Sequence, residues 1–116
     1  ITACDYCTET RQLMNELVSL SDHITLNEYD LEDDVAIAMQ YHVDKVPTIV
    51  LTARDSDKIT DFGVRFCGIP AGHEFISFIR GLLQVSRRDS GLSKDTRAYL
   101  AALDKPVLLQ VFTTPT

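Results

Sequence analysis

Positive charge is in short supply in this sequence, which also has no tryptophan and only three cysteines. Its 11 Lys and Arg are outnumbered by 17 Asp and Glu, a formal net charge of −6, and the densest basic spot is Arg87-Arg88. Nucleic acids and anionic membrane surfaces both attract basic faces, so this balance argues against either partner. No apolar run approaches the roughly 20 residues of a membrane-spanning helix.

We expect no secretory signal, because the sequence opens on Ile1 without a charged lead followed by an apolar stretch. A secreted scaffold held by disulfides would carry more cysteines, in an even number. Here Cys4 and Cys7 stand three apart and Cys67 stands alone. This arrangement favours a reducing compartment, and we expect the cytoplasm.

The 116 residues amount to one domain, long enough to bury a core. Apolar residues recur at helical spacing in some segments and alternate or run continuously in others. These patterns predict, in order, a helix over 6–20, a strand over 23–31, a helix over 32–42, strands over 47–51 and 59–67, a helix carrying 75–83, a helix over 93–103 and a strand over 106–112.

Strands that alternate with helices indicate an α/β fold built around a mainly parallel sheet. Such a unit should have a strand leading into its first helix, yet only Ile1-Thr2-Ala3 precede Cys4. We therefore expect the first strand to be missing, or to be replaced by the apolar segment 106–112. The replacement would come from the same chain or from a neighbouring copy by strand exchange, giving a homo-oligomer. The alternative is that the sequence is a fragment of a longer chain.

The spacing Cys4-Asp5-Tyr6-Cys7 at a helix start has a specific chemical logic. Unpaired N–H groups and the positive end of the helix dipole stabilise a thiolate there. Cys4 is expected to attack a disulfide and Cys7 to resolve the mixed disulfide. Two alternatives stay open: half of a zinc site, although no second cysteine pair follows, and an inert pair.

Pro47 begins an apolar strand, the position that a residue without a donor N–H can occupy. Propensity alone favours a trans bond, since only about 5–6% of X–Pro bonds are cis. The redox context reverses that preference. A cis Pro47 would leave the backbone of Val46 free to pair with an extended substrate.

The segments 4–7, 43–48, 63–65 and 68–75, the last containing Gly-Ile-Pro-Ala-Gly, resemble the glutaredoxin-like protein disulfide oxidoreductases. Members carry two thioredoxin-fold units in one chain. The resemblance implies a thioredoxin/glutaredoxin-like fold, in which a central mixed sheet is flanked by helices. It also implies thiol–disulfide exchange with protein substrates, electrons from a thioredoxin reductase, and neither a cofactor nor a metal. Carried over, the catalytic residues are Cys4 and Cys7, and the substrate-binding residues are Asp5, Tyr6, Val46 and Pro47.

Within that family the chain resembles the amino-terminal unit. The resemblance divides it into a redox unit over 1–88, a linker helix over 89–105 and, over 106–116, a strand equivalent to the start of a second unit. A near alternative is the amino-terminal domain of a peroxide-reductase flavoprotein, which shares the doubled fold. The complete Cys-x-x-Cys in this first unit favours the disulfide oxidoreductase. An alternative of another class is a binding module that keeps the fold but has lost redox turnover.

Three further residues have two interpretations each. Cys67 is expected to be a packed thiol rather than a third redox cysteine. His73 is expected to lie on the surface near a helix start. Glu28 is either a buried carboxylate that shuttles protons to Cys7 or a residue with access to solvent.

Overall fold

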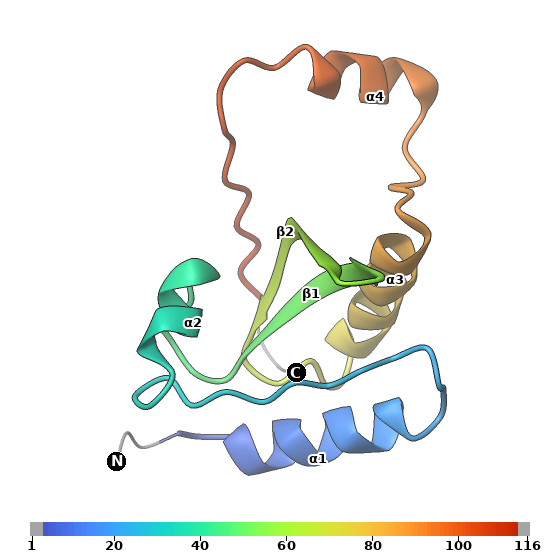
Figure 1. Ribbon diagram of the computed structural model, residues 1–116. Helices are drawn as coiled ribbons and strands as arrows, with labels where there is room; N and C mark the ends of the chain where they lie inside the picture. Colours follow the sequence, from blue (N-terminus) through green and yellow to red (C-terminus); the bar gives the residue numbers. More distant parts are fainter. Residues whose placement is uncertain (1–3, 114–116) are drawn as a thin grey trace.

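The computed structural model describes residues 4–113 of the chain (Figure 1). Each helix and the hairpin form where the apolar pattern predicted them, within a few residues at their ends. The order is α1 (Cys7–Val18), α2 (Val35–Gln40), β1 (Thr48–Asp55), β2 (Lys58–Cys67), α3 (Glu74–Arg87) and α4 (Lys94–Ala101). The result is a small α/β structure that is compatible with a thioredoxin-like fold.

The sheet consists of β1 and β2, which pair antiparallel from Thr48 opposite Cys67 to Asp55 opposite Lys58. The register shifts after Leu51, so that two residues of β2, Phe62 and Gly63, have no direct partner on β1. Gly63 has a φ of 85°, a conformation that other residues rarely adopt. The glycine therefore permits an irregularity in β2 that a side chain would strain.

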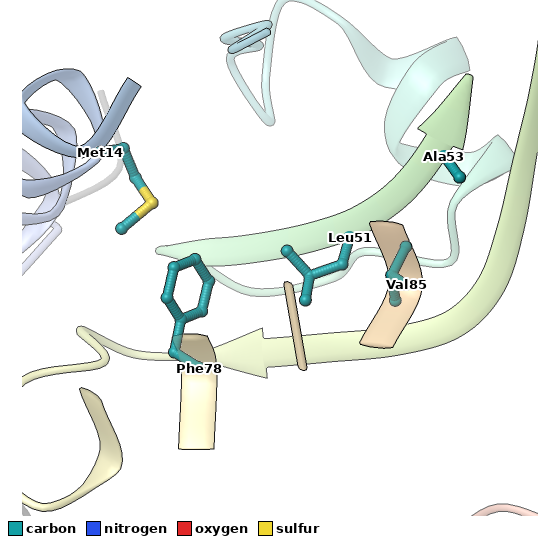
Figure 2. Close-up of a cluster of buried hydrophobic side chains, with 5 residues drawn as sticks. All are labelled: Met14, Leu51, Ala53, Phe78 and Val85. Atoms are coloured by element: carbon teal, nitrogen blue, oxygen red, sulfur yellow. The ribbon is translucent and has the colours of Figure 1, made fainter. Parts of the chain in front are cut away.

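The hydrophobic core lies between the hairpin and α3, with a contribution from α1 (Figure 2). Leu51 and Ala53 alternate along β1 and face α3, where Phe78 is 1% exposed. The ring of Phe78 meets that of Phe66 edge-on, with centroids 5.2 Å apart. Met14 extends into this cluster from α1. α1 and α3 therefore supply side chains to one cluster, but only α3 packs directly on the hairpin.

Two of the predicted strands do not form within the described residues, so these predictions are wrong. Residues 23–31 and 106–112 adopt no strand, and the sheet is a two-stranded antiparallel one rather than a central mixed sheet. A strand exists only where a neighbour accepts its backbone hydrogen bonds, and within 4–113 neither segment has one. Replacement of the first strand by 106–112 of the same chain is therefore wrong. Residues 114–116, the end of the segment predicted to start a second unit, and residues 1–3 lie outside the described range.

Arg65 on β2 ties the end of α2 to the sheet. Its guanidinium donates to both carboxylate oxygens of Asp61, at 2.8 and 2.6 Å, and to the carbonyl oxygen of Tyr41 at 3.2 and 3.0 Å. It also lies 5.9 Å from the centre of the Tyr41 ring. This forked geometry positions α2 against the hairpin.

The Asp61–Arg65 pair predicts a loss of stability in acid. The hydrogen bond from Arg65 lowers the pKa of Asp61 below its ordinary value of 3.8, and the amide of Gly63 lowers it further against the opposing effect of burial. A lowered pKa in the folded state stabilises the fold above 3.8, and this contribution is lost as the pH falls toward the folded value. The free energy of unfolding should therefore decrease less at acid pH in Asp61→Asn than in the wild type. Urea titration at a series of pH values measures this decrease.

The matched variant Arg65→Lys keeps the positive charge but cannot donate in parallel to both carboxylate oxygens of Asp61. It should therefore reduce the loss of stability in acid by a smaller amount than Asp61→Asn does. If the free energy of unfolding of Asp61→Asn fell as steeply in acid as that of the wild type, this assignment would be wrong.

Candidate functional site

Cys4 and Cys7 form a disulfide at the amino-terminal end of α1, with their Cα atoms 5.6 Å apart. Cys7 is the first residue of the helix, and Tyr6 before it has a left-handed φ of 69°. This reversal brings Cys4 back beside Cys7. The helix therefore begins at the cysteine pair, as predicted, and the pair lies near the first backbone amides of α1.

Thr10 holds this first turn in place. Its N–H and its hydroxyl both donate to the carbonyl oxygen of Tyr6, at 2.9 and 2.6 Å, and the residue is 6% exposed. Sequence reasoning missed Thr10. Its spacing of three residues after Cys7, on the inner side of the helix, is the signal that could have indicated it.

Val46 and Pro47 lie at the entry to β1. The peptide bond between them is cis, and the carbonyl oxygen of Pro47 accepts a hydrogen bond from the N–H of Gly68 at 2.8 Å. This bond joins the start of β1 to the end of β2. Within residues 4–113, the N–H and C=O of Val46 make no hydrogen bond.

A cavity of about 330 Å³ brings part of the predicted site together. It opens between α1, the segment 25–31, α2 and the start of β1, and its lining includes Cys7, Val46 and Pro47. Asp5 and Tyr6 do not line this cavity and are exposed at the surface beside the disulfide. The predicted set therefore divides into a cavity group and a surface group, with the cysteine pair between them.

Glu28 and Arg11 form an ion pair at the wall of the cavity, 3.1 Å apart. The side chain of Glu28 is 50% exposed. Of its two interpretations, the solvent-accessible one is confirmed, and a buried proton shuttle is not what this geometry provides.

Cys67 is exposed, so the expectation of a packed thiol is wrong. It ends β2 opposite Thr48, and the Thr48 hydroxyl lies 3.7 Å from its sulfur. His73 precedes the first residue of α3 and is exposed, as expected.

In residues 4–113 no three His, Cys, Asp or Glu side chains gather as a metal site would require. The same range contains no helix of the length and apolar character needed to cross a membrane.

The chain is similar to one part of the F subunit of alkyl hydroperoxide reductase. It is 28% identical over 108 residues to this protein from Staphylococcus epidermidis, which covers 93% of the chain and 18% of the relative. It is 35% identical over 91 residues to the Pseudomonas aeruginosa protein of the same name, which covers 78% of the chain and 15% of that relative. An NADH dehydrogenase of Ferdinandcohnia aciditolerans is 36% identical over 76 residues, covering 66% and 12%. No protein-family model matches the chain.

The chain spans less than a fifth of the length of these relatives. Two of these relatives carry the name of the peroxide reductase, which is one of the two families that the sequence resembles. These relatives do not support the unit arrangement of the disulfide oxidoreductases. The similarity and the Cys4–Cys7 pair together support a thiol-based redox function.

Proposed function

We propose that this chain is a thiol–disulfide exchange unit that acts on protein disulfides through Cys4 and Cys7. The observation that carries the proposal is the disulfide between these residues at the first turn of α1, beside a cavity that Cys7 shares with Val46 and Pro47. The relatives, named as a reductase and a dehydrogenase, support redox chemistry at this level.

In the reducing direction, the Cys4 thiolate attacks one sulfur of the substrate disulfide and releases the other as a thiolate. Cys7 then attacks the Cys4 sulfur of the mixed disulfide and releases the second substrate thiolate. Two electrons pass to the substrate, and the Cys4–Cys7 disulfide remains. A disulfide reductase, which the resemblance implies to be a thioredoxin reductase, restores the dithiol.

The first turn of α1 favours the thiolate form. Amides at a helix start and the positive end of the dipole stabilise negative charge on a nearby sulfur. The bonds from Thr10 to the Tyr6 carbonyl oxygen fix this turn. Asp5, between the cysteines, opposes the effect by its own charge, which favours a pair that reduces its substrates.

Substrate docking is proposed at Val46 and at the surface formed by Asp5 and Tyr6. The unbonded N–H and C=O of Val46 can pair with an extended peptide segment that carries the target disulfide. The 59% exposed Tyr6 side chain offers an apolar face beside the reacting sulfurs.

A redox titration tests the proposal. The chain is equilibrated in glutathione buffers of graded ratio, its free thiols are alkylated, and intact mass counts them. We expect a single two-electron transition between roughly −200 and −270 mV, the range of glutaredoxins and thioredoxins. The Cys67→Ser variant removes the exposed third thiol and should titrate at the same potential. A pair without a reversible transition would instead indicate the redox-silent binding module.

A further inference from the structure

Thr10 is the one polar residue that is buried among residues 4–113, with an exposed fraction of 6%. It follows Cys7 by three residues on α1 and lines the same cavity. A buried hydroxyl needs a hydrogen-bond partner, and here that partner is the carbonyl oxygen of Tyr6, at 2.6 Å. The only buried polar side chain of the described chain is therefore bonded to the backbone between the two cysteines.

The carbonyl that accepts this bond belongs to the residue at which the chain reverses. Tyr6 has a φ of 69° and a ψ of 8°, a left-handed conformation that is unfavourable for a residue with a side chain. The N–H of Thr10 donates to the same carbonyl oxygen at 2.9 Å, as the helix requires. The hydroxyl bond is an addition that only serine or threonine can make to the carbonyl four residues earlier.

The additional bond has its effect when the disulfide is open. In the oxidised chain the bond between the sulfurs itself holds Cys4 beside Cys7. In the dithiol or a mixed disulfide that bond is broken, and Tyr6 can relax toward a more favourable conformation. Relaxation would separate the sulfurs and lower the effective concentration of the Cys7 thiol at the Cys4 sulfur. The hydroxyl of Thr10 opposes this change because it holds the Tyr6 carbonyl in place.

We propose that Thr10 is a positioning residue for the resolving step, an inference that rests on the proposed function. In that step the Cys7 thiolate attacks the Cys4 sulfur of the mixed disulfide. The Cys4–Cys7 bond forms, the bond to the substrate sulfur breaks, and the substrate leaves as a thiolate. Thr10 exchanges neither electrons nor protons with the sulfurs. It keeps Tyr6 in the conformation from which this attack is short, so it stabilises the closed disulfide relative to the open forms.

Thr10→Val isolates the hydroxyl, because it replaces that group by a methyl group. The Tyr6 carbonyl keeps its bond from the backbone N–H, so no buried acceptor is left without a partner. We expect the effective concentration of Cys7 at Cys4 to fall about fivefold, in line with the net contribution of one hydrogen bond. For a two-electron couple, this change raises the reduction potential of the pair by about 20 mV.

Glutathione is the probe in the test. The full chain with Cys67→Ser, alone and with each further substitution, is equilibrated in glutathione buffers, quenched with acid and alkylated. Intact mass then gives the ratio of the single glutathione adduct to the closed disulfide at a fixed concentration of reduced glutathione. This ratio should be about fivefold higher in Thr10→Val than in the parent chain. Thr10→Ala also lacks the hydroxyl and should show the same increase, which keeps the test available if the valine variant does not fold.

Two matched variants control for other effects of the substitution. Thr10→Ser keeps the hydroxyl and should give the parent ratio. Thr8→Val makes the same chemical change at an exposed position of the same helical turn and should also give the parent ratio. A role in stability alone would lower the free energy of unfolding, measured in urea, and leave the ratio of adduct to disulfide unchanged.

Several results would overturn this inference. One is the parent ratio in the variants that lack the hydroxyl of Thr10, whatever their stability. Another is an equal increase in Thr10→Ser or in Thr8→Val, which would assign the effect to packing or to the turn as a whole. If the parent chain forms no reversible disulfide, the proposed function fails and this inference fails with it. If the parent chain titrates as expected and the Thr10 variants match it, this inference alone is wrong.

Discussion

Cys4→Ser is expected to lower the rate of dithiothreitol-driven insulin reduction to the uncatalysed rate. Serine keeps the size of the side chain but cannot form the thiolate that attacks a disulfide. Loss of a nucleophile removes the covalent route entirely, and we expect a decrease of at least about a hundredfold in the catalysed rate.

Cys7→Ser should separate the two steps. Attack by Cys4 still proceeds, but the neighbouring thiol that resolves the product is gone, so the variant mixed with insulin in the absence of dithiothreitol should accumulate a mixed disulfide with the substrate. Non-reducing electrophoresis detects this species as a band that dithiothreitol removes. The matched control is Cys67→Ser, which leaves Cys4 and Cys7 in place and should reduce insulin at the wild-type rate.

Two outcomes would contradict the assigned order of the cysteines. One is a mixed disulfide that accumulates in Cys4→Ser and not in Cys7→Ser, which would make Cys7 the nucleophile. The other is full activity in both single variants, which would place the reaction at Cys67.

Phe78→Ala is expected to have the largest effect on stability, a loss of about 3–5 kcal/mol in the free energy of unfolding. Phe78 is 1% exposed and meets Phe66 edge-on in a core with few fully buried residues. The helix lies close to the sheet here, since a Cβ at Gly81 would come within 3.4 Å of Leu51. The surrounding residues therefore have little freedom to close the cavity that alanine leaves.

Urea unfolding measures this loss, and two variants keep it interpretable. Phe78→Leu fills most of the same space and should lose less, so it gives a value if the alanine variant does not fold. Phe62→Ala removes a ring that is 49% exposed on β2 and should cost clearly less. Equal losses at the two phenylalanines would show that α3 does not pack as described.

The sequence predicted the elements whose stabilising contacts are local. The apolar stripe of α3 and the alternating pattern of β2 are visible in the order of residues, and both elements occur where expected. The cysteine pair was likewise predictable as a pair at a helix start, because its spacing and the following periodicity lie within one segment.

What could not be predicted depends on partners distant in the sequence. Residues 106–112 have the composition of a buried strand, but composition does not supply the neighbour that accepts its hydrogen bonds. Cys67 is exposed because it lies on the face of β2 opposite Val64 and Phe66, which pack against the core. Which face of β2 meets the core depends on packing in three dimensions. The cavity beside Cys7 is bounded by four segments, and no local pattern encodes their meeting.

Asp104 and Lys105, between α4 and the segment 106–112, make no backbone hydrogen bond within the described residues. Insertions at such a junction break no packed surface, and the entropic penalty of a longer connection grows only with the logarithm of its length. Evolution can therefore vary the length of chain between α4 and the segment 106–112 while the packing of α1, α3 and the hairpin stays unchanged. Among homologous sequences, this junction is where differences in chain length should be tolerated most readily.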